Sequence, residues 1–307
     1  MSQSSSGKWS AGMLTVPPAD AGVAGAGTIP AYRRLLELGW DPESPTLAAT
    51  RRLLFRLLAE DEDPSYLAEM AAEATDDLLI RRSRGILREA AAAALAQAGY
   101  ESDPRLRGAA KRVIDRLAAY LKSPLSQKPW IRIGNQHVLP PEVAAPSFHT
   151  LVMLAHMPYF RSEHHETIDR LYNYLAQPWP RQTAVQQLGA HLIEQPHLVM
   201  GDFLPTRNAM DGDMPSALAW LELMARLGFL RRNDGWMRLI DRLQDDRDRH
   251  GVWHAPRAVV MPEVVPSWSW PTMPLTNRAG REENIGPDVT FRLGLIAKLS
   301  GRAVDLV

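Results

Sequence analysis

Residues 227–253 read LGFLRRNDGWMRLIDRLQDDRDRHGVW, and a tetrapeptide inside this stretch decides the fold class because the chain repeats it. The tetrapeptide Ile-Asp-Arg-Leu occupies residues 240–243, 168–171 and 114–117. Its Ile and Leu, three positions apart, share one face of a helix, while its Asp and Arg point away from that face. Each copy therefore predicts an amphipathic helix with one buried side.

Each copy is preceded by a predicted helix that ends at an aromatic residue. The four endings are Leu38-Gly39-Trp40, Ala98-Gly99-Tyr100, Met157-Pro158-Tyr159 and Leu227-Gly228-Phe229. In three of them a glycine can take the left-handed conformation that ends a helix. In the earliest unit, residues 54–57 take the place of the tetrapeptide. The unit is thus a helical hairpin, and stacked hairpins share one core.

The recurring helix endings predict an all-α protein. We expect a flexible or partner-docked N-terminal arm at residues 1–28 and a single helical-repeat domain at residues 29–307. The predicted helices lie near residues 31–38, 44–60, 66–80, 84–98, 104–121, 147–157, 162–176, 183–194, 214–227, 233–246 and 288–300. Two long loops rich in proline and tryptophan, residues 122–146 and 251–287, are expected to lie over one end of the helices.

Composition excludes several classes of protein. Lys plus Arg and Asp plus Glu both total 35, so no net field attracts nucleic acid. The absence of cysteine excludes disulfides, thiolate zinc sites and cysteine nucleophiles. Neither a signal peptide nor an apolar run of the roughly 18 residues that a membrane span needs is found. We expect a cytoplasmic protein, and peripheral association with a membrane complex stays open.

Residues 227–253 also resemble the repeat of the terpenoid cyclase and protein prenyltransferase superfamily, with Gln244, Gly251 and Trp253 at the matching positions. The resemblance implies an α/α toroid, which is two concentric layers of helices. It does not extend to the known chemistry, because the nearest strings to the cyclase Asp-x-Asp-Asp motif are residues 61–64 and 211–214, and neither completes it. The prenyltransferase zinc site needs a cysteine, which this chain lacks.

Polar and aromatic residues late in the chain suggest one ligand pocket, formed by Asp211, Asp213, Trp253 and His254. Carboxylates held close together can share a proton or bind a cation. The alternative is a loop in which Asp213 caps the following helix. The spacing of the histidines does not match a helical zinc site. We therefore predict no catalytic residue, no metal and no cofactor.

Tryptophans in or beside loops are the second clue. They are Trp130, Trp179, Trp253, Trp268 and Trp270. Together with Trp9 in the arm, Trp130, Trp268 and Trp270 are predicted to contact a partner, since tryptophan buries a large area at low entropic cost. Two alternatives remain, namely that they fill the end of the toroid or that they enter a membrane headgroup layer.

These observations favour a non-catalytic helical scaffold. We expect an accessory or assembly subunit that docks on a larger protein complex through its arm and its tryptophan-bearing loops. The alternative is an isoprenoid enzyme or a carrier of an apolar ligand that uses the toroid centre as its pocket.

Overall fold

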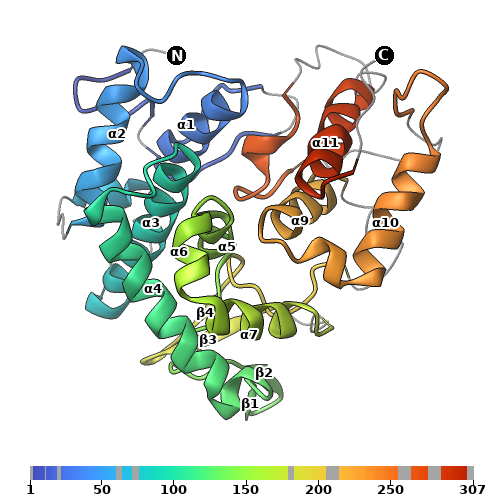
Figure 1. Ribbon diagram of the computed structural model, residues 1–307. Coiled ribbons are helices and arrows are strands. Elements are labelled where there is room, and N and C mark those ends of the chain that lie inside the picture. Colours follow the sequence, from blue (N-terminus) through green and yellow to red (C-terminus); the bar gives the residue numbers. More distant parts are fainter. Residues whose placement is uncertain are drawn as a thin grey trace.

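The computed structural model describes residues 3–10, 12–18, 22–59, 64–70, 76–178, 183–204, 214–254, 264–275 and 285–302. The regular structure of these residues is mostly helical (Figure 1). The α-helices are α1 (Thr28–Glu37), α2 (Pro45–Leu58), α3 (Asp77–Gln97), α4 (Pro104–Lys122), α5 (Phe148–Ala155), α6 (Pro158–Glu163), α7 (His165–Leu175), α9 (Met214–Arg226), α10 (Asp234–Asp245) and α11 (Ile285–Leu299). Short 3-10 helices are η1 (Pro64–Met70), η2 (Pro124–Ser126), η3 (Leu230–Arg232) and η4 (Trp270–Thr272).

Two small antiparallel hairpins correct the all-α prediction. Strands β1 (Ile131–Ile133) and β2 (Gln136–Val138) form the first, and β3 (Val185–Leu188) and β4 (His191–Glu194) form the second. The helix predicted at residues 183–194 is therefore wrong. Gly189 takes a φ of +60° in the turn, where a left-handed residue reverses the chain and pairs the two flanking segments.

One helix replaces two predicted ones in the first third of the chain. Residues 77–97 form the continuous helix α3, whereas helices were predicted at 66–80 and 84–98. Asp76 caps α3 by accepting a hydrogen bond from the backbone N–H of Leu79 at 2.9 Å. Gly85 inside α3 does not break it, because an isolated glycine lowers helix stability by only about 1 kcal/mol.

The repeated tetrapeptides lie within α4, α7 and α10, each on a helix as predicted. Their Ile and Leu side chains are all buried: Ile114, Leu117, Ile168, Leu171, Ile240 and Leu243. The Asp and Arg between them are exposed in all three copies. The sequence pattern therefore identified the buried face of each of these helices.

The glycine endings are also confirmed. Gly39, Gly99 and Gly228 have φ values of +81°, +89° and +78°, and the N–H of the next residue bonds back to the last helical turn in each case. Gly301 ends α11 in the same way, with a φ of +67°. Helices α1, α3, α9 and α11 thus share one type of C-terminus.

The helices differ in how much of their surface is buried. Every residue of α5 and all but Arg226 of α9 are buried, whereas α4, α7 and α10 bury one face. Contacts run from α1 to α3, from α3 to α5, from α5 to α9 and from α9 to α11. Figure 1 shows α11 and α1, from opposite ends of the chain, on the same side of the molecule.

The two long loops do not lie together, contrary to the prediction. The first contains the hairpin of β1 and β2, at the bottom of Figure 1. The described part of the second contains η4, which packs on α1 at the top of that view. Each loop covers a different region of the helical body.

Buried charges join the first and last helices. Arg292 of α11, 1% exposed, contacts Glu37 of α1 at 2.8 Å and Glu222 of α9 at 2.9 Å. Its Nε donates to the carbonyl of Thr272 at 3.0 Å. Burial and the charge of Glu222 raise the pKa of Glu37. Burial also opposes ionisation of Glu222, but Arg292 and Arg226 outweigh it and leave the pKa of Glu222 below its usual value.

Removing the shared arginine is expected to destabilise the fold strongly. Arg292→Met leaves Glu37 and Glu222 buried without their common cation, which costs roughly 3–5 kcal/mol. Urea unfolding measures the loss. Arg238→Met on the exposed side of α10 is the matched control and should change stability by about 0.5 kcal/mol at most. Equal losses in the two variants would contradict the role assigned to Arg292.

The described residues of the N-terminal arm pack on the chain's own helices. The carbonyl of Gly7 accepts a 2.6 Å hydrogen bond from Thr50 of α2. Farther along, Glu69 of η1 accepts hydrogen bonds from the backbone N–H groups of residues 13–15, and Met13 is fully buried. The arm is therefore not a free extension, and its docking on another protein stays a prediction.

Gly7 is expected to be essential for seating the arm. Its φ is +89°, and a Cβ there would lie 2.6 Å from the backbone of Ala49. Gly7→Ala should cost at least about 1–2 kcal/mol and speed hydrogen exchange across residues 3–18. Gly85→Ala in α3, where a Cβ meets open space, should instead stabilise by about 0.5–1 kcal/mol. An unchanged exchange rate in the Gly7 variant would refute the close contact.

Among the described helices, none combines the length and the apolar character that crossing a membrane requires.

Candidate functional site

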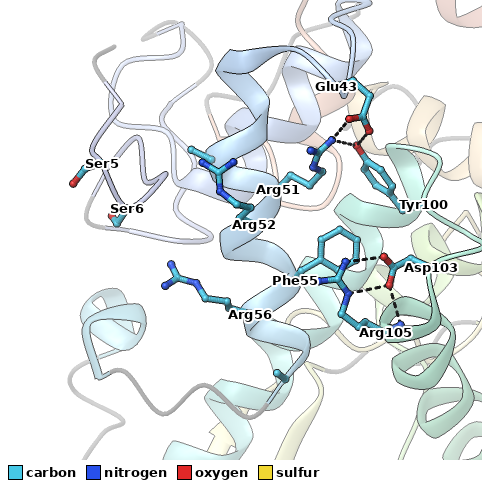
Figure 2. Close-up of a pocket in the computed structure, with 12 residues that line it drawn as sticks. Ser5, Ser6, Glu43, Arg51, Arg52, Phe55, Arg56, Tyr100, Asp103 and Arg105 are labelled. Carbon is cyan, nitrogen blue, oxygen red and sulfur yellow. Dashed lines mark hydrogen bonds and ion pairs between the residues drawn. The ribbon is translucent and has the colours of Figure 1, made fainter.

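A groove of about 860 Å³ lies between α2, the turn from α3 to α4 and the N-terminal arm (Figure 2). Most of the residues that line it are polar or charged, and Phe55 and Tyr100 add two aromatic rings. The lining residues are Ser5, Ser6, Glu43, Ala49, Arg51, Arg52, Phe55, Arg56, Ala59, Tyr100, Asp103 and Arg105. Three segments far apart in the sequence thus contribute to one concave surface.

Helix α2 supplies the first wall. Arg52 and Arg56 lie four residues apart, so their side chains stand one turn above the other on the same side of the helix. Both residues are exposed, and neither forms an ion pair or hydrogen bond within the described part of the chain. Figure 2 shows their guanidinium groups on the side of α2 where the arm runs. These two cations are available to a ligand.

The turn after α3 supplies the second wall. The hydroxyl of Tyr100 donates to Glu43 at 2.5 Å and accepts from Arg51 at 2.7 Å, and Arg51 also pairs with Glu43 (Figure 2). The hydrogen bonds from Tyr100 and Arg51 lower the pKa of Glu43. This arrangement holds Arg51 in a fixed orientation at the rim.

A second arginine is held at the start of α4. Asp103 accepts from Nε and Nη2 of Arg105 at 3.0 and 2.8 Å, and these bonds lower the pKa of Asp103. The guanidinium of Arg105 lies 3.8 Å from the ring centre of Phe55, in cation-π contact. Tyr100 packs edge-on against the same ring, with 5.7 Å between centroids. Phe55 therefore orders both walls.

The charges of the lining do not cancel. Four arginines face two carboxylates, and both carboxylates have lowered pKa values, so they are ionised at neutral pH. The groove therefore carries two excess positive charges on a protein whose formal net charge is zero. This arrangement suits binding of an anionic group by bidentate arginine contacts.

Sequence reasoning did not find this groove. The sequence feature that could have indicated it is an arginine pair at 51 and 52 with a third arginine at 56. All three lie on the polar side of the helix predicted at residues 44–60. That pattern is ordinary for a solvated helix face. Only the fold brings Tyr100 and Asp103 across from it.

Trp268 and Trp270 are interior residues, so the prediction that they form exposed partner anchors is wrong. They are 5% and 1% exposed. Trp268 stacks on Phe148 with ring centroids 4.0 Å apart, and the ring of Trp270 lies 3.5 Å from the guanidinium of Arg34. Both rings therefore bury a large area within the protein itself.

Trp9 and Trp130, the other predicted partner contacts, are both half-buried. Trp9 stacks on Tyr32 of α1, with ring centroids 6.5 Å apart. Trp130 packs against the main core just before β1. Their contact with a partner stays a prediction. Trp179 lies outside the described residues.

The predicted ligand pocket is not assembled by the described residues. Trp253 is fully buried, and its backbone N–H donates to Thr290 of α11 at 2.9 Å. His254 is exposed and pairs with Asp248 at 2.9 Å. Asp211 and Asp213 lie outside the described residues, so their part of the prediction is untested.

His149 lies in the interior, at 5% exposure. Burial, with smaller contributions from His197 and Arg33, lowers the pKa of His149 to about 3. Burial similarly lowers the pKa of His197 to about 4. Within the described ranges, no group of three or more His, Cys, Asp or Glu residues has metal-binding geometry.

Stability should fall between about pH 6.5 and pH 3. His149 stays neutral in the folded state until its pKa of about 3, whereas in the unfolded chain it binds a proton near pH 6.5. The unfolded state therefore gains protons first, and at pH 5 this histidine alone costs about 2 kcal/mol.

The measurement is urea unfolding of the protein and of His149→Gln at pH 7.5 and pH 5.0. The His149 variant should lose about 2 kcal/mol less over this interval. His137→Gln, at an exposed position of β2, is the control and should follow the unsubstituted protein. Identical pH dependence in all three proteins would show that His149 is not held neutral.

The chain matches no family model, no curated protein and no solved structure.

Proposed function

We propose that this chain is a non-catalytic helical scaffold, an accessory subunit that binds an acidic segment of a partner protein in the arginine groove. One observation carries the proposal: Arg52 and Arg56 line the groove, are exposed, and form no ion pair or hydrogen bond within the described residues. Arginines without an internal partner are free to form bidentate contacts with carboxylates.

The pattern of charge favours an acidic protein segment over nucleic acid. Glu43 and Asp103 interrupt the arginines of the groove, and they repel a continuous phosphate backbone at two places. The chain as a whole carries no net positive charge that would attract a polyanion. Carboxylates on flexible side chains can instead approach Arg52 and Arg56 and avoid both acidic residues.

We further propose that the helices form an α/α toroid like that of the terpenoid cyclase and prenyltransferase superfamily. The succession of contacts from α1 through α3, α5 and α9 to α11, together with the ion pair of Arg292 with Glu37, supports a closed inner layer. The one-sided burial of α4, α7 and α10 supports an outer layer. In this arrangement the groove lies on the outer layer, at α2.

An apolar ligand at the centre, the alternative function, has less support. Phe148, Trp268, Phe203 and Trp220 contact one another in the interior, and the 4.0 Å stacking of Phe148 on Trp268 leaves no room for a ligand between them. A binding protein that uses its outer surface fits this interior better than a carrier does.

Binding of a fluorescein-labelled hexaglutamate peptide, followed by fluorescence anisotropy at low salt, tests the proposal. The double variant Arg52→Gln/Arg56→Gln should weaken binding roughly five- to tenfold, because each exposed charge pair contributes up to about 1 kcal/mol. Added salt should weaken binding of the unsubstituted protein as well.

The control is Arg112→Gln/Arg170→Gln, which removes the same charge from exposed positions of α4 and α7. Its affinity should stay within about twofold of the unsubstituted protein. Equal weakening in both double variants would contradict the proposal, because only the overall charge would then matter. Tighter binding of a single-stranded oligonucleotide that also depends on Arg52 and Arg56 would overturn it in favour of nucleic acid.

A further inference from the structure

The arm forms the third wall of the groove, and it presents hydroxyl groups there. Ser5 and Ser6 are both exposed and line the groove, and Figure 2 shows the arm that carries them on the side of α2 to which Arg52 and Arg56 extend. The proposed function, binding of an acidic partner segment, uses the arginines and leaves these serines without a role.

Ser6 is held in place from both sides along the chain. Immediately after it, the carbonyl of Gly7 accepts a 2.6 Å bond from Thr50 of α2, and the tight approach of Gly7 to Ala49 leaves no room for a side chain. Before it, the side chain of Gln3 donates to the same Thr50 hydroxyl at 2.8 Å. Thr50 lies two residues before Arg52, so the arm is fixed beside the free cations.

Modification of the Ser6 hydroxyl would break only one weak, exposed hydrogen bond. Its Oγ lies 2.8 Å from the Oγ of Ser4, in an exposed contact between two small side chains. A phosphoryl group on this oxygen adds a charge of about −1.5 to −2 and three strong acceptors. Arginine guanidinium groups are the preferred protein partners of such a group.

We propose that Ser6 is a phosphorylation site and that its phosphate binds Arg52 and Arg56, so that the modified arm occupies the groove in place of the acidic partner segment. The inference rests on the proposed function for its consequence, although the contact of phosphate with arginine does not depend on a partner. Phosphorylation closes the groove to other anions through simple competition for two cations.

The modification is an ordinary phosphoryl transfer from a nucleoside triphosphate, catalysed by a protein kinase. The Oγ of Ser6 attacks the γ-phosphorus and forms the new P–O bond, while the bond from the γ-phosphorus to the β,γ-bridging oxygen breaks. The nucleoside diphosphate leaves, and the hydroxyl proton passes to solvent. No oxidant or reductant takes part.

Phosphoserine installed at residue 6 during translation tests the contact directly. Phosphorus-31 NMR titration should give a second phosphate pKa roughly one unit below that of phosphoserine at residue 162, an exposed serine of α6. The difference should disappear in the Arg52→Gln/Arg56→Gln background. If the second phosphate pKa at residue 6 is the same with and without these two substitutions, the proposal is overturned.

Hexaglutamate binding to the same proteins separates this inference from the proposed function. Phosphorylation at residue 6 should weaken peptide binding roughly tenfold, and phosphorylation at residue 162 should leave it unchanged. If the unmodified protein never binds hexaglutamate but the phosphate pKa still depends on Arg52 and Arg56, the proposed function fails and the phosphate site stands. If the peptide binds equally well to all forms, the competition proposed here is wrong.

Discussion

The buried contact of Arg292 with Glu37 and Glu222 is the constraint on which the rest of the structure depends. It ties α11 to α1 and α9, so two ends of a 307-residue chain are held at one place. A buried ion pair adds little stability compared with apolar residues packed in the same place. Removing one member is nevertheless costly, because the remaining charges are left in an interior that cannot solvate them. The network therefore acts mainly to specify which helices meet, and it leaves the hydrophobic core to supply most of the stability.

The packing of α1 also bears on the groove. Because α1 is fixed between α3 and η4, the arm that precedes it must cross α2 at a defined place, where Gly7 meets Ala49. The serines of the arm and the free arginines of α2 are brought together by this crossing. The proposed binding surface and the proposed phosphate that would block it both depend on this route of the chain.

Periodicity predicted the helices well wherever one face is buried. The tetrapeptides of α4, α7 and α10 and the glycine endings of α1, α3 and α9 are local features, and the fold kept them. Periodicity failed at residues 183–194, because apolar spacing in a short segment does not distinguish a helix from a hairpin. The prediction for the loop tryptophans failed for a related reason, because a position in a loop does not determine whether a side chain is buried. Trp268 and Trp270 fill the interior although they lie in a proline-rich loop.

The sequence by itself determined the helical class, the buried faces of α4, α7 and α10 and the glycine positions where helices end, because each depends on neighbours within about one turn. Only the tertiary structure decided that α11 joins α1, that the arm lies on α2, and that Arg52, Arg56 and Ser6 line one groove. Those outcomes depend on residues far apart along the chain. Their approach is fixed by how the helices pack and by where the buried charges find partners, which no local pattern encodes.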